Sequence, residues 1–181
     1  MQALIDIVKQ GKALYVGISK YPPAQAKIAY EMLRAAGVPC LISQYRYSMF
    51  DRTVEEKSLP LAAEQGSGFI AFSPLAQGLL TKKYLHGIPE HSRAARSTGF
   101  LKVDQVTEDK VGKARRLDEI AARRGQTLAE MALAWVLKDE RMTSVIVGTS
   151  SVKQLADNLH ALDNLNFTNE ELAEIEGILR L

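Results

Sequence analysis

The sequence has one cysteine, no long apolar run and little net charge, and each absence excludes a class of protein. A lone Cys40 cannot form an internal disulfide, which favours the reducing cytoplasm over a disulfide-rich secreted scaffold. No apolar stretch reaches the roughly 20 residues that span a bilayer, and the N-terminus lacks the basic start of a signal peptide. A formal net charge of +2 is too small to indicate nucleic acid. We therefore expect a cytoplasmic protein whose partners are neither a membrane nor a nucleic acid.

Several motifs of catalysis and cofactor binding are also missing. There is no Gly-x-Gly-x-x-Gly segment, so a Rossmann dinucleotide site is not expected. There is no serine nucleophile elbow and no zinc or phosphoryl-transfer motif. His86, His91 and His160 are not spaced as metal ligands, so no metal site is predicted.

What the sequence does contain is four short apolar runs that alternate with helical patterns. The runs predict strands at 14–19, 40–45, 69–73 and 144–148. Alternation of this kind predicts an α/β protein with a parallel sheet and right-handed crossovers. Four βα units make half of a (β/α)8 barrel of the TIM type, which usually has about 250 residues. We therefore expect residues 1–181 to form one domain, a half-barrel that exposes the residues expected to fill the barrel interior, such as Val16, Ile18, Ile70 and Ile146.

Helix signals fit this scheme. Thr107, Ser151 (or Ser150) and the Thr168-Asn169-Glu170-Glu171 capping box predict helix starts, and Gly37 predicts a helix end. The helix after Ser151 is expected to reach about residue 162. Residues 86–104 show no periodicity and are expected to form a long loop.

Polar residues end the first two predicted strands. In a barrel, such positions point into the mouth where active sites lie. Ser19 therefore has two interpretations, a residue of the mouth or an ordinary turn or capping serine. Gln44 either receives a planar carboxamide in the mouth or bonds a neighbouring loop.

The ends of the third and fourth strands suggest a site for a flat ring and for phosphate. Phe72 could stack on a heterocycle, and Ser73-Pro74 before Gly78 predicts a tight turn that offers backbone N–H groups to a phosphate, with Lys82 and Lys83 nearby. The alternative is a core phenylalanine and solvated lysines. After the fourth strand, residues 148–151 lead into a helix start that suits an anion, or is a plain N-cap. Together the four strand ends favour the anion site.

These four segments, in this order, resemble the aldo-keto reductase family, and most closely the branch of potassium-channel β subunits and bacterial glyceraldehyde 3-phosphate reductases. The resemblance covers essentially the whole chain and implies a barrel that binds NADPH in an extended form across its C-terminal face. It implies that Ser19 and Gln44 bond the nicotinamide amide and that Phe72, usually a tyrosine in the family, stacks on the ring. The other residues that it implies in cofactor binding are Ser73, Leu75, Gly78 and Lys83 at the pyrophosphate, Arg93 closing over the cofactor, Gly148, Ser150 and Gln154 near the 2′-phosphate, and Asp157 and Asn158 near the adenine.

The chain departs from the family pattern in two ways. Lys20 stands where many members have Asn. The family's catalytic Asp, Tyr, Lys and His lie on its first four strands, whereas this chain is expected to begin just before the fifth, so no catalytic residue is assigned. The sequence thus predicts the cofactor-binding half of an NADPH-dependent reductase of small carbonyl compounds, inactive alone and lacking its N-terminal half. The alternative is a non-catalytic half-barrel that binds nucleotide or self-associates.

Overall fold

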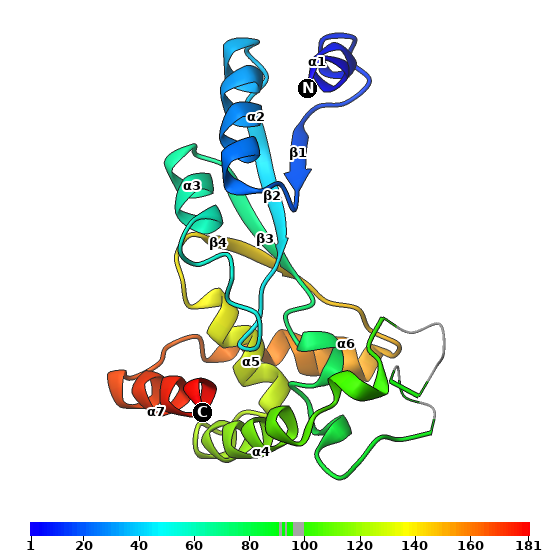
Figure 1. The fold of residues 1–181 in the computed structure, drawn as a ribbon, viewed down its shortest axis with the longest axis vertical. Helices are drawn as coiled ribbons and strands as arrows, with labels where there is room; N and C mark the ends of the chain where they lie inside the picture. The colour runs from blue at the N-terminus through cyan, green and yellow to red at the C-terminus, as the bar shows by residue number, and fades with distance from the viewer. Residues whose placement is uncertain (91, 93, 96–99) are drawn as a thin grey trace.

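Figure 1 shows the computed structural model of the chain, which describes residues 1–90, 92, 94, 95 and 100–181. One sheet carries four strands: β1 (Val16–Ser19), β2 (Cys40–Arg46), β3 (Gly68–Phe72) and β4 (Met142–Ile146). All neighbouring pairs are parallel, and the spatial order β1-β2-β3-β4 repeats the order along the chain. The predicted α/β fold with a parallel sheet is confirmed.

Helices connect the strands as the alternating pattern predicts. α1 (Gln2–Lys9) precedes β1, while α2 (Pro23–Ala35) and α3 (Ser58–Glu64) connect β1 to β2 and β2 to β3; α4 (Glu108–Arg123) and α5 (Leu128–Leu137) lie between β3 and β4, and α6 (Val152–Leu159) and α7 (Asn169–Arg180) follow β4. Short 3-10 helices occur at η1 (Ala76–Gly78), η2 (Lys82–Tyr84), η3 (Val103–Gln105) and η4 (His160–Asp163). The helix expected to reach about residue 162 therefore ends as an α-helix at Leu159 and continues as a 3-10 turn.

The helix ends form where the sequence signals place them. The hydroxyls of Thr107 and Ser151 accept from the backbone N–H three residues later, at 3.3 and 3.2 Å. Thr168 and Glu171 exchange two such bonds, at 3.2 and 2.9 Å, which makes the predicted capping box. Gly37 follows α2 with a φ of 72°, a left-handed conformation that glycine adopts without steric cost.

The two faces of the sheet differ in burial. On one face Tyr45 and Phe69 stack with ring centroids 5.1 Å apart and both belong to the core. Val16 and Ile18 are only 7% and 5% exposed and belong to the same core. The prediction that these two fill the barrel interior with Ile70 and Ile146 is therefore wrong. Side chains alternate along a strand, so the open face of β1 carries the residues between and beyond them, at 17 and 19.

The same core continues below the sheet, into a region where α5 stands between β4 and the pair α4 and α7 (Figure 1). Its buried centre includes Leu117, Trp135, Ile175 and Ile178. Tyr47, which directly follows β2, packs on Trp135 with ring centroids 5.7 Å apart and so ties this region to the sheet. Among the described residues, no helix has the length and apolar character needed to cross a membrane.

Candidate cofactor site

The polar residues that end β1 and β2 lie side by side. In the strand register Ser19 is the partner of Gln44, and Arg46 is the partner of Phe72. Because all strands are parallel, these residues lie at one edge of the sheet, the carboxyl edge. Ser19 is exposed, and Gln44 and Phe72 are half-buried. The structure thus brings together the three residues expected to face a flat ring and its amide.

The backbone is strained at this edge. Lys20, Ser73, Ala76 and Gln77 have φ values of 57°, 54°, 47° and 60°, and they are the non-glycine residues with positive φ among those that the structure describes. Each conformation of this kind costs energy for a residue with a side chain, and such residues cluster at functional sites. All four follow β1 or β3 at their carboxyl ends, so the strain is confined to the candidate site.

The turn after β3 forms as predicted, but its N–H groups are largely used within it. The amides of Ala76, Gly78, Leu79 and Leu80 donate to carbonyls of the same turn, at 2.8 to 3.2 Å. The expectation that this turn offers several backbone N–H groups to a phosphate is therefore wrong for these four. The reason is that the left-handed residues curl the chain into a 3-10 turn, whose i to i+3 bonds consume the donors.

A groove of about 610 Å³ lies between this turn and the connection from β4 to α6. Seven of the predicted site residues line it: Ser73, Leu75, Gly78, Lys83, Gly148, Ser150 and Gln154. The same groove is lined by Gln77 and Thr81, which the sequence patterns did not single out. Their amide and hydroxyl groups lie close in sequence to predicted residues, which is the signal that could have found them.

Thr81 positions the cationic wall of the groove. Its hydroxyl donates to the Gly78 carbonyl at 2.7 Å and accepts from the Lys83 N–H at 3.2 Å. The two lysines that follow have different environments. Lys82 pairs with Asp118 at 3.6 Å, whereas no described carboxylate lies within salt-bridge distance of Lys83. Lys83 is thus the cation left available to an anion in the groove.

The other wall is closed by a local hydrogen-bond pair. The Gln154 side-chain carbonyl accepts from the Ser150 N–H at 2.9 Å and from its hydroxyl at 3.1 Å. Both residues are exposed. An anion placed between them would take over two donors that now serve a neutral oxygen, and hydrogen bonds to an ionised acceptor are roughly twice as strong.

Asp157 and Asn158, two more of the predicted site residues, lie on α6 and do not line the groove. Asp157 pairs with Lys153 at 2.8 Å on α6. Asn158 is 8% exposed, and its Nδ2 has no hydrogen-bond partner. A buried amide donor without an acceptor is unusual in native proteins. Arg93 lies outside the described residues.

Sequence comparisons identify the family behind these features. The aldo/keto reductase family model matches residues 1–180. The chain belongs to the aldo/keto reductase family. The resemblance inferred from the four strand ends is thereby confirmed.

This aldo/keto reductase chain has curated relatives with which it shares nearly half of its aligned residues. It is 48% identical over 178 residues to a protein of Escherichia coli O157:H7 named L-glyceraldehyde 3-phosphate reductase. It is 46% identical over 178 residues to the protein of that name in strain K12 of the species. Each alignment covers 96% of this chain and 51% of the relative. The chain therefore spans about half the length of the curated relatives it matches.

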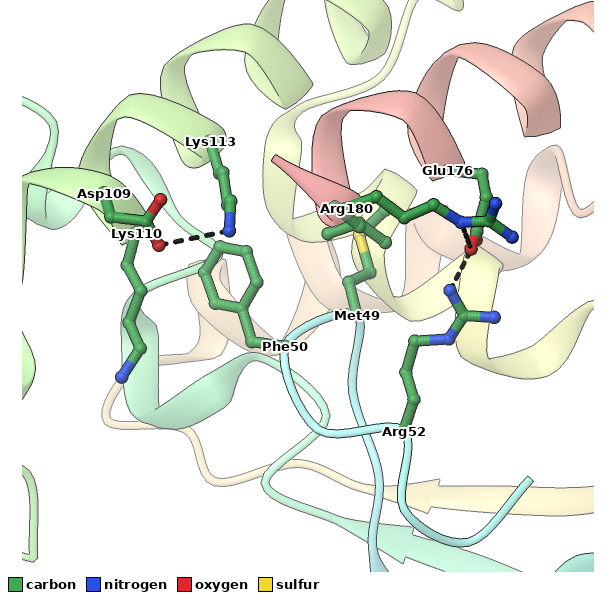
Figure 2. Close-up of a pocket in the computed structure, with 9 residues that line it drawn as sticks. Met49, Phe50, Arg52, Asp109, Lys110, Lys113, Glu176 and Arg180 are labelled. Atoms are coloured by element: carbon green, nitrogen blue, oxygen red, sulfur yellow. Dashed lines mark hydrogen bonds and ion pairs between the residues drawn. The ribbon is translucent and has the colours of Figure 1, made fainter. Parts of the chain in front are cut away.

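A second cavity of this aldo/keto reductase chain was not predicted from sequence (Figure 2). It measures about 250 Å³ and lies between the loop after β2, the start of α4 and the end of α7. Its lining is Met49, Phe50, Arg52, Asp109, Lys110, Lys113, Glu176, Leu179 and Arg180.

The charges of this second cavity largely satisfy one another. Glu176 pairs with Arg52 at 2.5 Å and with Arg180 at 2.8 Å, and Lys113 pairs with Asp109 at 3.1 Å. The bonds from Arg52 and then Arg180 lower the pKa of Glu176, and a side-chain bond to Glu55 raises the pKa of Arg52. The cavity is therefore a charged seam between three segments, which we call the Arg52–Glu176 seam.

Proposed function

We propose that this chain is the cofactor-binding part of an NADPH-dependent carbonyl reductase of the aldo/keto reductase family. The observation that carries the proposal is the groove, where the turn after β3 meets the connection after β4. It brings Lys83, which has no carboxylate partner among the described residues, and the donors of Ser150 to one hollow of about 610 Å³. A dinucleotide with several phosphates is an elongated anion that suits such a lining.

The proposed architecture is half of a (β/α)8 barrel, with residues 1–181 as one domain. Four parallel strands in sequential order, with helices over one face, support it. In such a barrel the cofactor lies across the carboxyl edge of the strands. That is the edge where Ser19, Gln44 and Phe72 lie together.

The proposed roles follow the placement of each side chain. Phe72 provides a flat surface for the nicotinamide ring, and Ser19 and Gln44 hold its amide, which fixes the face of the ring that a substrate meets. The remaining assignments are Ser73, Leu75, Gly78 and Lys83 at the pyrophosphate, Gly148, Ser150 and Gln154 at the 2′-phosphate, Asp157 and Asn158 at the adenine, and Arg93 as a closing residue. The unpaired Nδ2 of Asn158 fits a ring nitrogen that accepts a hydrogen bond.

NADPH, when bound, supplies the hydride that adds to the carbonyl carbon of the substrate. The substrate oxygen then needs a proton, and we assign no residue of this chain to give it. The two relatives are named for the reduction of L-glyceraldehyde 3-phosphate. We accordingly propose a small carbonyl compound as the substrate of the intact enzyme, with the catalytic acid outside these 181 residues.

Titration of the purified chain with NADPH and with NADH tests the proposal. We expect binding of NADPH, seen as a change in its fluorescence, and weaker binding of NADH because it lacks the 2′-phosphate that Ser150 and Gln154 would hold. The affinity for NADPH is expected to fall as salt is added, since screening weakens exposed charge pairs. Equal affinities, or tighter NADH, would contradict the assignment of Ser150 and Gln154.

A specific observation favours a second candidate, a half-barrel that assembles with another chain. β1 and β4 are the outer strands of the sheet. Next to β1 the exposed apolar side chains are Leu14 and Tyr15, and on α6 they are Val152, Leu155 and Leu159. Apolar surface beside the open edge of β1 and on α6 is surface that a second half-barrel would cover.

A further inference from the structure

Two cations approach the same aromatic ring at the carboxyl edge of the sheet. The Lys20 Nζ lies 6.0 Å from the centroid of the Phe72 ring, and the guanidinium carbon of Arg46 lies 5.9 Å from it. They come from different strands, since Lys20 follows β1 and Arg46 ends β2. Because both side chains are long and flexible, a small anion beside the ring is within reach of both.

These cations are poorly neutralised by the chain itself. Among the described carboxylates, none lies within salt-bridge distance of Lys20. Arg46 has one such neighbour, Asp51, at 4.0 Å, and the other oxygen of Asp51 accepts the Thr53 hydroxyl at 2.9 Å. The Arg46 side chain is 56% exposed, so it retains its freedom to turn toward a ligand.

The backbone of Lys20 is held in a costly conformation. Its φ of 57° is left-handed, a region that lysine adopts far less readily than glycine or asparagine. Its N–H donates to the Gln44 carbonyl at 3.0 Å, so the ladder of the sheet fixes this backbone in place. A charged residue in a strained position at a strand end indicates function.

The proposed cofactor does not use these charges. Its phosphates would lie in the groove beside Lys83 and Ser150. Lys20 and Arg46 instead approach the ring of Phe72, on which the nicotinamide is proposed to stack. Arg46 also lines a cavity of about 130 Å³ that shares Ser73 and Gln77 with the groove. The charged side chains that line this small cavity are Arg46, Asp51 and Lys110, so Arg46 faces a space that adjoins the cofactor groove.

We propose that Lys20 and Arg46 form an anion subsite that holds the phosphate or carboxylate of a small carbonyl substrate. The identification of the bound anion as a substrate rests on the proposed function. The existence of an anion subsite does not depend on it. Two cations that flank the nicotinamide would place the carbonyl over the ring by holding the far end of the molecule. A neutral carbonyl compound of the same size would gain nothing from them.

The test is a titration of the full, 15N-labelled chain with glycerol 3-phosphate and with glycerate, with neutral glycerol as the control ligand. Amide shifts are expected at residues 19–21 and 45–47 with the two anions and not with glycerol. Lys20→Gln and Arg46→Gln are each expected to weaken binding roughly tenfold, as the loss of a charge-assisted bond does. Lys27→Gln, which removes an exposed lysine on α2, is the matched control and should bind as the wild type does.

Further variants separate an anion site from a merely structural role. Arg46→Lys keeps the charge and should retain most of the affinity, while Asp51→Asn removes the competing carboxylate and should tighten binding. Thermal midpoints of Lys20→Gln and Arg46→Gln are expected to match the wild type, since both side chains are exposed. Unchanged affinity in these two variants would overturn the proposal, as would the absence of any binding.

Repeating the titration with NADPH bound separates the subsite from the cofactor groove. Shifts confined to residues 148–154, and abolished by NADPH, would mean that the anions occupy the cofactor's own phosphate site and would overturn the subsite. If NADPH fails to bind while the anions still shift residues 19–21 and 45–47, the proposed function fails and the subsite stands.

Discussion

The carboxyl edge of the sheet and the Arg52–Glu176 seam both gather basic side chains around a cavity, yet they differ in every other respect. At the seam Arg52, Lys113 and Arg180 each have a carboxylate partner at 2.5 to 3.1 Å. At the strand edge Lys20 has none among the described residues, and Arg46 has only a 4.0 Å neighbour. The number of cations around a cavity is therefore a poor guide to anion binding. Whether those cations already have carboxylate partners is a better one.

The two regions also differ in backbone. The seam is built from ordinary helices and a short bridge between Ser48 and Asp51. The strand edge holds the left-handed residues Lys20, Ser73 and Gln77. At the strand edge a strained backbone adjoins cations that have no close carboxylate partner among the described residues. Both features are typical of ligand-binding sites.

The largest expected effect concerns catalysis, because the strand edge holds the proposed cofactor-binding groups and no residue is assigned there as a proton donor. We expect the 181-residue chain to show no carbonyl reduction with NADPH, as the loss of placed acid catalysis costs about 10²–10⁴ in rate and the loss of positioning costs more. Purified chain should be assayed with methylglyoxal and 4-nitrobenzaldehyde. Turnover in the ordinary enzyme range would show that the strand edge is complete and that the half-enzyme interpretation is wrong.

The next effect tests the groove directly. Gln154→Glu places a carboxylate where the 2′-phosphate is proposed, so NADPH should bind roughly 10- to 100-fold more weakly while NADH changes little. Fluorescence titration of both cofactors measures this. Gln25→Glu, the same charge change at an exposed position of α2, is the control. Equal losses for both cofactors would place the 2′-phosphate elsewhere.

A smaller effect is expected at the seam, where the role is structural. Glu176→Gln leaves Arg52 and Arg180 with a neutral partner, and the free energy of unfolding should fall by about 1 kcal/mol without any change in NADPH binding. Urea unfolding gives the value. Glu174→Gln, which breaks the more exposed pair with Arg123 on the same helix, is the control and should cost less.

The same variant should alter the dependence of stability on pH. Because the arginines lower the pKa of Glu176 below its ordinary 4.5, its contribution is fully present above that value and is lost as the pH falls through the lower pKa of the folded state. Stability of the wild type should therefore fall more steeply than that of Glu176→Gln below pH 4.5. Parallel curves would mean that Glu176 is not paired in solution.

The smallest change in a measured quantity is a twofold one, the mass of the particle. The open edges at β1 and β4 and the apolar stripe of α6 should make the chain associate, so light scattering is expected to give at least twice 20.0 kDa. Val152→Lys, at a side chain that is 86% exposed, should shift the population toward monomer. A single 20.0 kDa species across a micromolar dilution series would show that the edges need no cover.

The pattern of the sequence predicted the four strands, their parallel order and the helix starts at Thr107, Ser151 and Thr168. It did so because apolar runs and capping residues act locally, over a few positions of the chain. It was wrong for Val16 and Ile18. The sequence shows that they alternate with residues 17 and 19, but it does not show which face of the sheet their side chains occupy. A period of two says that neighbours face opposite ways, and only the packing of helices on one face says which way is inward.

The candidate site divides in the same manner. The sequence by itself determined the family and the residues at each strand end, because a motif is a run of neighbouring residues that can be recognised without the fold. Only the tertiary structure decided that the turn after β3 uses its own N–H groups and that Lys20 and Arg46 approach one ring. It also decided that Lys82 has a carboxylate partner, whereas Lys83 has none among the described residues. Pairing of charges and donors depends on distances of a few ångströms between segments far apart in sequence, and those distances exist only once the sheet has brought the strand ends together.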